Sequence, residues 1–158
     1  MAVADLIGAA VGVMLLVIVA YLLVGSTLST AEIVTNAQKA AALQEQTQLR
    51  TDFSLENITT ENSFINCTIH NTGKEVISDF KHMDAVVYDR SARDFRLYQY
   101  STDGGPGTWT ITDKGTEVIH PSELDPGEAY QISIQTTADS PAWFQITTGT
   151  GVYNSKIL

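Results

Sequence analysis

Basic residues are missing from the start of this chain, because all nine lysines and arginines lie at or beyond Lys39. A secretory signal peptide needs a basic first region, a short apolar core and a small-x-small cleavage site. The basic region is absent here and the apolar run is too long, so the sequence argues against a cleaved signal. The same absence means that counting positive charges gives no orientation for a membrane span at this end.

Cysteine occurs once, as Cys67, which excludes a disulfide within the chain. Cys67 lies in the alternating run Ile65–Ile69, on the same face as the two isoleucines. We interpret it as a small buried apolar residue. The alternative is a reactive thiol, which no neighbouring motif supports.

Catalytic and metal-binding motifs are also lacking. The chain has no G-x-S-x-G sequence, no Walker loop and no Cys-His signature. The acid pairs Glu123/Asp125 and Glu123/Glu128 flank a Pro-Gly turn, and we interpret them as solvated turn residues. Zinc ligands come at regular short spacings, which the three histidines do not have: His70, His82 and His120. We therefore expect neither an enzyme nor a bound cofactor or metal.

Negative charge dominates the rest of the chain, with 18 acidic residues and a net charge of −9. All of the acids except Asp5 and Glu32 lie beyond Lys39. DNA phosphates and anionic lipid headgroups repel such a surface. We expect a protein partner, or a glycan on a protein, and no binding of nucleic acid.

The longest feature that is present is an uncharged apolar run of 26 residues, Leu6–Ala31. A helix of this length rises ~39 Å at about 1.5 Å per residue, which exceeds the ~30 Å hydrocarbon core of a bilayer. Two interpretations remain open for residues 6–31. The run is either a retained membrane anchor or a stalk helix that packs in the core of a filament.

Three residues of this segment are candidates for helix–helix packing. Gly8 and Gly12 have the G-x-x-x-G spacing of closely packed membrane helices. Asp5 is a lone carboxylate beside the run and is costly in hydrocarbon. It either stays among the headgroups and caps the helix, or it pairs with the terminus of a neighbouring subunit.

The helical pattern continues beyond the apolar run. Residues 31–50 are rich in Ala, Gln, Glu and Leu and contain neither Gly nor Pro. The sequence therefore predicts one helix of 40 or more residues, which ends at Thr51 and Asp52. We divide the chain into a helix, residues 1–52, and an outer domain, residues 53–158.

From Phe53 onward the hydrophobic period changes to two, which is typical of strands. Turn residues separate eight candidate strands, with no helical pattern between them. This arrangement predicts an α+β protein whose second part is an antiparallel, immunoglobulin-like β-sandwich. The expected strands are Phe64–His70, Val76–Ile77, Met83–Asp89, Phe95–Ser101, Thr108–Thr112, Glu117–Ile119, Tyr130–Thr136 and Trp143–Thr148, and the expected core residues are Val86, Tyr98, Trp109, Ile132, Ile134, Trp143 and Phe144.

Two sequons, Asn57-Ile58-Thr59 and Asn66-Cys67-Thr68, are candidate N-glycosylation sites. Glycans are added to such sites outside the cytoplasm. If they are used, the outer domain is extracytoplasmic.

Several segments, taken in order, resemble one group of proteins over nearly the whole chain. They are the helix exit GSTLSTA at 25–31, Asn71-Thr72-Gly73, the segment FKHMDAVV at 80–87, Leu124-Asp125-Pro126-Gly127-Glu128, and Ile146-Thr147-Thr148 before Gly151-Val152. This order resembles the archaellin-like, archaeal type IV pilin-like proteins. Within that group it is most similar to the archaellum accessory proteins FlaF and FlaG.

The resemblance to FlaF and FlaG implies a retained helix in the cell membrane and a domain between the membrane and the S-layer. It implies a stator that binds S-layer protein or a sibling accessory protein and forms homo- or hetero-oligomers. The candidate contact residues on the strands are Val76, Val86, Phe95, Tyr98 and Tyr100. A processed chain resembles instead a filament subunit, an archaellin or pilin, in which Asp5 matches the acidic fifth residue of pilins.

Overall fold

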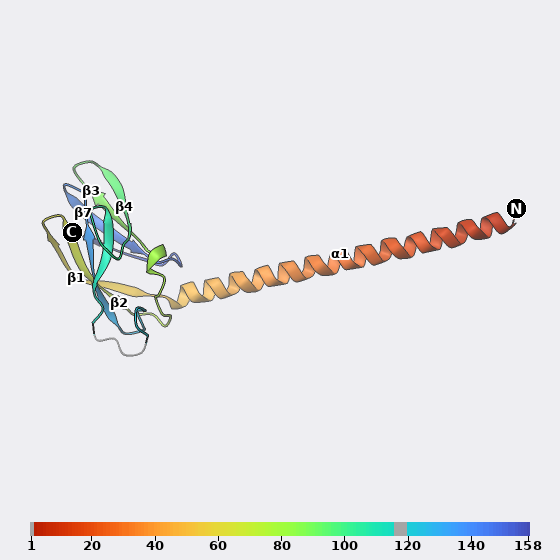
Figure 1. Cartoon of the computed structure of the whole chain (residues 1–158), viewed down its shortest axis with the longest axis horizontal. Coiled ribbons are helices and arrows are strands. Elements are labelled where there is room, and N and C mark those ends of the chain that lie inside the picture. The colour runs from red at the N-terminus through yellow and green to blue at the C-terminus, as the bar shows by residue number, and fades with distance from the viewer. Residues whose placement is uncertain (1, 116–119) are drawn as a thin grey trace. The chain divides into compact units, whose positions relative to one another are not determined.

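A computed structural model describes residues 2–115 and 120–158, and side chains within this part except those of residues 2 and 5. It begins with one continuous helix, α1, Ala2–Arg50, of 49 residues (Figure 1). This confirms the predicted single long helix. The chain forms two compact units, residues 1–43 and 44–158, so the last turns of α1 belong to the β-rich unit.

The helix of the first unit has no polar side. The helix is long and apolar enough from Leu6 onward to cross a membrane, judged by length and composition, and its most apolar stretch has a mean hydropathy of 2.8. The threonine hydroxyls are satisfied within the helix, since Thr27 donates to the Leu23 carbonyl at 2.7 Å and Thr30 to that of Ser26 at 2.9 Å. A helix that is apolar all round requires lipid or protein around it.

In the described part of the second unit, eight strands form one sheet in the order β1-β2-β6-β5-β4-β3-β7-β8. Every pair is antiparallel except β4 and β5. The sheet curls so that its two edges meet, and Asn154 on β8 donates to the Phe53 carbonyl on β1 at 2.9 Å. The strands are β1 Phe53–Glu61, β2 Phe64–Asn71, β3 Asp84–Asp89, β4 Asp94–Tyr100, β5 Thr108–Asp113, β6 Ala129–Gln135, β7 Pro141–Thr147 and β8 Tyr153–Ile157, with the short 3-10 helix η1 at Phe80–His82. The predicted α+β class is confirmed.

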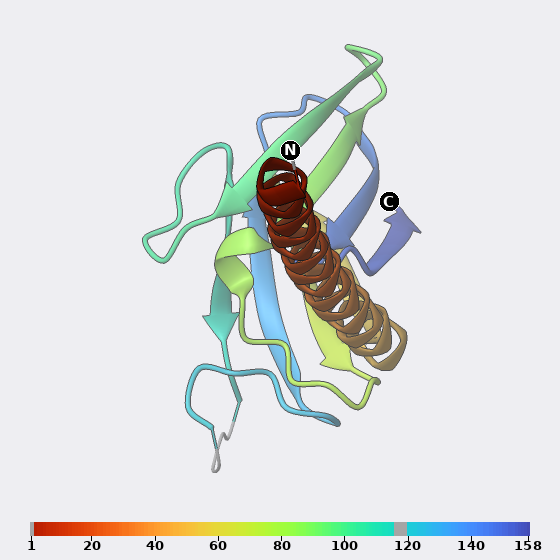
Figure 2. The same ribbon diagram turned by 90° about the vertical axis from the view of Figure 1, so that its right-hand side faces the viewer.

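Six of the predicted strands are present, within two residues at each end, as β2 to β7. The predicted strand Val76–Ile77 is reduced to a bridge between Ile77 and Leu124, and Glu117–Ile119 lies outside the described residues. Strands β1 and β8 were not predicted. A bulge between Glu56 and Thr59 interrupts the alternation of β1, and β8 is a polar edge strand beside β7 (Figure 2).

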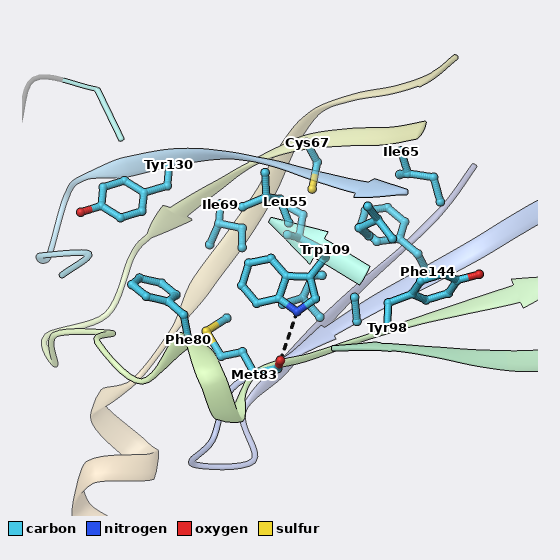
Figure 3. Packing of buried hydrophobic residues seen from close by; sticks show 14 of the residues in the cluster. Leu55, Ile65, Cys67, Ile69, Phe80, Met83, Tyr98, Trp109, Tyr130 and Phe144 are labelled. Carbon is cyan, nitrogen blue, oxygen red and sulfur yellow. Dashed lines mark hydrogen bonds between the residues drawn. The ribbon is translucent and has the colours of Figure 1, made fainter. Parts of the chain in front are cut away.

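The core lies inside the curled sheet, and Trp109 is its largest fully buried side chain (Figure 3). The indole Nε1 of Trp109 donates to the Met83 carbonyl at 3.1 Å, which satisfies its polar atom without water. The predictions for Tyr98, Trp109, Ile132, Ile134 and Phe144 are confirmed, since each is at most 1% exposed.

Two core predictions are wrong. Val86 and Trp143 are only half-buried and lie on the outer face of the sheet. Ala85, Val87 and Phe144 occupy the inward positions of β3 and β7, and strand side chains alternate between faces. Cys67 is buried as expected, and burial raises the pKa of its thiol to about 12.

Candidate interaction surface and its anchor

An apolar row crosses the outer side of strands β4, β3, β7 and β8. Phe95 stands opposite Tyr88, Tyr88 opposite Trp143, and Trp143 opposite Ile157. Because directly paired residues of neighbouring strands point to the same side, these four side chains form one continuous strip. Leu97 and Val86 extend it along β4 and β3. We call these six residues the aromatic face.

The rings of the aromatic face pack against one another, with Tyr88 and Trp143 half-buried and Phe95 largely open to solvent. The Tyr88 and Phe95 ring centroids are 5.0 Å apart, and Phe95 meets Trp143 edge to face at 5.9 Å. Phe95 is 62% exposed, and Ile157 is 81% exposed. Contiguous exposed apolar patches on protein surfaces are typical of interaction sites, so the aromatic face is a candidate for one.

Two arginines lie beside one end of the aromatic face, although the protein is acidic. Arg90 and Arg93 are exposed in the turn between β3 and β4, with the exposed Asp94 between them and Phe95. Arg96 and Lys156 belong to the other side of their strands, because they stand opposite the core residues Val87 and Phe144. A partner that covers the aromatic face therefore meets basic side chains only at its β3–β4 end, among the residues that the structure describes.

Asp89 holds the turn that carries these arginines. Its buried carboxylate accepts hydrogen bonds from the Ser91 hydroxyl at 2.7 Å and the Ser91 N–H at 3.0 Å. It also accepts one from the Asp139 N–H at 3.1 Å, which joins the turn to the segment before β7. The Ser91 hydroxyl is the main cause that lowers the pKa of Asp89 to about 2. The turn is therefore fixed by an ionised side chain at neutral pH.

The candidate contact residues from the sequence do not share one surface. Val86 and Phe95 belong to the aromatic face. Tyr98 points inward, is 1% exposed and bonds through its hydroxyl to Thr136 at 3.0 Å, so its side chain cannot contact a partner. Tyr100 packs half-buried on Trp109, with ring centroids 4.9 Å apart.

Val76 is 40% exposed and lies beside the Ile77 bridge, outside the strands that carry the aromatic face. Sequence analysis missed Tyr88 and Ile157 as surface residues and assigned Trp143 to the core. The signal was the alternation along Pro141–Thr147, which places Trp143 and Phe144 on opposite faces.

The other half of the sheet has a polar outer side. Strands β1, β2, β6 and β5 form a shallow hollow lined by polar side chains, including Asn57, Asn66, Thr68 and Gln131. Both candidate glycosylation residues, Asn57 and Asn66, lie there. The structure thus gives the two halves of one sheet different outer surfaces.

The end of α1 is anchored to the sheet by the turn after β2. The Arg50 carbonyl accepts a hydrogen bond from the Lys74 N–H at 2.8 Å, and the Arg50 guanidinium lies 2.7 Å from the Glu75 carboxylate. The carbonyl of Asp52 accepts from the N–H groups of Thr72 and Gly73, at 3.1 and 2.9 Å. The bond from Lys74 satisfies the Arg50 carbonyl, one of those that a helix end otherwise leaves without partners.

Asn71 shapes this turn. It is fully buried, and its amide Nδ2 donates to the carbonyls of Glu75 at 2.9 Å and Leu124 at 2.8 Å. Its Oδ1 accepts from the Gly73 N–H at 3.0 Å. The Asn71-Thr72-Gly73 motif noted in the sequence therefore links the helix end, β2 and the loop before β6.

Among the residues that the structure describes, one cluster could hold a metal ion. Ligand atoms of His120, Glu123 and Asp125 lie within 4.8 Å of one another. The His120 Nδ1 and Asp125 Oδ2 atoms are 2.9 Å apart. The hydrogen bond with Asp125 and the nearby negative charges raise the pKa of His120 above its ordinary value. The protonated imidazole is thus the form that this acidic setting favours.

Comparison with known proteins gives an archaeal relative and two similar structures. No protein-family model matches the chain. An uncharacterized protein of Archaeoglobus fulgidus is 28% identical over 120 residues, which cover 75% of this chain and 71% of that protein. The archaellum periplasmic stator protein FlaG from Sulfolobus acidocaldarius aligns with a TM-score of 0.50 and 21% identity, over 68% of this chain and 99% of that chain.

The FlaF and FlaG stator complex from the same organism aligns with a TM-score of 0.49 and 20% identity, over 67% of this chain and 87% of that chain. The resemblance found in the sequence is confirmed at the level of the fold: this chain contains the fold of the archaellum stator protein FlaG.

Proposed function

We propose that this protein is a non-enzymatic, membrane-anchored accessory protein of the archaellum that acts as a stator. The observation that supports this most is the union, in one chain, of an apolar helix long enough to cross a membrane with a domain of the FlaG fold. Residues 6–31 lie in the cell membrane, and the β-domain, residues 53–158, is extracytoplasmic.

A stator must hold its domain against the torque of a rotating filament. The junction after α1 suits this load, because backbone hydrogen bonds and the Arg50–Glu75 ion pair join the helix end to the β2 turn. The buried Asn71 extends the connection to the loop at Leu124. Force that arrives at the sheet is shared by several strands before it reaches the helix.

The aromatic face is the surface that binds the fixed partner in this proposal. Its exposed rings supply apolar contact area, and Arg90 and Arg93 at its β3–β4 end suit carboxylates on a partner surface. We assign this partner to the S-layer. The outer face of a folded sheet suits a stator better than a flexible tail, because its side chains are held in fixed positions.

The test combines co-sedimentation with isolated S-layer sheets and swimming assays. The full chain carries F95S and W143S, and the matched control carries T112A and Q131A on the polar outer side. We expect the first variant to lose sedimentation with S-layer and swimming at normal membrane abundance, and the control to keep both. Unchanged sedimentation of the first variant contradicts the assignment. If the unaltered chain binds a sibling accessory protein instead of the S-layer, the proposed surface stands and the proposed partner is wrong.

A filament subunit is the second candidate function. Gly8 and Gly12 lie four residues apart in the apolar part of α1, the spacing of closely packed membrane helices. Such a helix suits packing against copies of itself. Intact mass and N-terminal sequencing of protein from membranes and from sheared filaments separate the two functions. Recovery from filaments, with removal of a leader, favours the subunit.

A further inference from the structure

The two sequons lie side by side on neighbouring strands. Thr59 of the first sequon stands opposite Asn66 of the second in the pairing of β1 with β2. The Asn57 amide Nδ2 donates to the Thr68 hydroxyl at 3.4 Å, so the acceptor residue of one sequon contacts the threonine of the other. Both sequons therefore lie in one small area of the sheet surface, but the pairing of the backbone differs between them.

Asn57 lies where β1 leaves its regular pairing. The register between β1 and β2 shifts from Glu56 to Thr59, so Asn57 and Ile58 have no residue directly opposite among the β2 positions described. Asn57 is exposed and has a φ of 50°, the left-handed region that asparagine tolerates better than most residues. β1 also lies at one end of the strand order, so that it pairs along its length only with β2. A local opening here breaks few hydrogen bonds.

Asn66 lies in the middle of a strand that is paired on both sides. It stands opposite Thr59 on β1 and Ser133 on β6. The next residue, Cys67, is 3% exposed and packs in the core. Presenting this sequon to an enzyme in an exposed, bent conformation requires β2 to separate from both neighbours and Cys67 to leave the core. The folded domain therefore protects Asn66.

We propose that Asn57 is an N-glycan acceptor of the folded chain and that Asn66 is not. The donor is an oligosaccharide linked to a polyprenyl phosphate or diphosphate, which an oligosaccharyltransferase supplies. Asn57 Nδ2 forms a bond to the anomeric carbon of the sugar, and the bond from that carbon to the lipid phosphate oxygen breaks. The phosphorylated lipid leaves, and one amide proton passes to a base of the transferase.

A glycan at Asn57 extends from the half of the sheet that does not carry the aromatic face. It covers the polar hollow around Thr68 and Gln131 and leaves Phe95 and Trp143 open. The modification therefore makes one outer side of the domain hydrophilic and sterically closed. This directs protein contacts to the other side.

The inference rests on the extracytoplasmic location in the proposed function, so the experiment contains its own test of location. The full chain is produced in an archaeon with active N-glycosylation, with a flexible Asn-Ala-Thr tag after Leu158 as a reference sequon. Intact mass and glycopeptide mapping are compared for the unaltered chain, N57Q, T59V, T59S and N66Q. T59V keeps the left-handed Asn57 and removes only the hydroxyl that the transferase needs, so its result does not depend on strain in the N57Q backbone.

We expect glycans on the tag and on Asn57 in the unaltered chain, T59S and N66Q, and on the tag alone in N57Q and T59V. A glycan on the tag with Asn57 empty, or any glycan on Asn66, overturns the inference and leaves the location intact. An unmodified tag and an unmodified Asn57 overturn the extracytoplasmic location, and the inference with it.

Discussion

The carbonyl of Arg50, the last residue of α1, accepts a hydrogen bond from the backbone N–H of Lys74 at 2.8 Å. This bond brings the chain after β2 directly against the helix end. Gly73, the residue before Lys74, has no room for a side chain: a Cβ would lie 2.7 Å from the Arg50 carbonyl oxygen and still closer to the Asp52 nitrogen. The close approach of two backbones therefore requires glycine at this position.

G73A tests the junction. We expect the free energy of unfolding of the β-domain to fall by about 1–3 kcal/mol, the usual range for atoms forced into a packed site. Urea unfolding followed by tryptophan fluorescence measures the change. T72A is the matched control, because Thr72 is exposed and its substitution leaves both backbones in place. Equal stability of G73A and T72A would show that the junction yields to an added methyl group.

The low pKa of Asp89 predicts that the folded protein loses stability in acid. Hydrogen bonds from Ser91 and Asp139 hold its pKa at about 2 in the folded protein, below the ordinary value of about 3.9 in an unfolded chain. Its contribution to stability is therefore complete above pH 4 and is lost as the pH falls towards 2. We expect urea unfolding between pH 2 and 6 to show this decline. D89N should be less stable at neutral pH and should lose that part of the pH dependence, whereas an unchanged slope contradicts the assignment.

The raised pKa of His120 predicts the opposite dependence of stability on pH. The hydrogen bond to Asp125 and the charges of Glu123 and Glu128 raise its pKa in the folded protein. The ion pair therefore stabilises the fold fully below the unfolded value of about 6.5, and this contribution disappears as the pH rises through the folded pKa. An NMR titration of the His120 ring measures that pKa. D125N should bring it back towards 6.5, and an identical titration in D125N rules out the pair as the cause.

The fold was largely predictable from local pattern. The uncharged run predicted the helix, and alternation with turn residues predicted six of the eight strands. The two missed strands are those at the edges of the sheet. Strand β1 contains the bulge after Glu56, and β8 exposes Tyr153 at 65%, so neither shows the clean period of a half-buried strand.

The candidate surface was less predictable, because it depends on which strands are neighbours. Phe95, Tyr88 and Trp143 come from β4, β3 and β7, and only the sheet order aligns them. From sequence, a tryptophan next to a phenylalanine favours the core for both. Asp89 was missed for the same reason, although its position at the start of an Asp-Arg-Ser turn is a recognisable Asx-turn signal.

Substitutions of Phe95 and Phe144 should distinguish side chains that bind a partner from side chains that stabilise the fold. Phe144 is 0% exposed, so F144A should lower the free energy of unfolding by about 3–5 kcal/mol through cavity formation. Phe95 is 62% exposed and loses only its ring contacts with Tyr88 and Trp143, so F95A should cost about 1 kcal/mol or less. Thermal and urea unfolding of the two variants measure these values.

The loss of partner binding should follow the reverse order, larger for F95A than for F144A, under conditions where both variants are folded. We expect F95A to bind isolated S-layer sheets at least tenfold more weakly than the unaltered chain, because a few large side chains carry most of the binding energy of an interface and Phe95 is the most exposed ring of the aromatic face. F144A, at low temperature where it remains folded, should bind like the unaltered chain, since its side chain never reaches the surface. A large stability loss in F95A would mean that its ring supports the sheet instead of a partner contact.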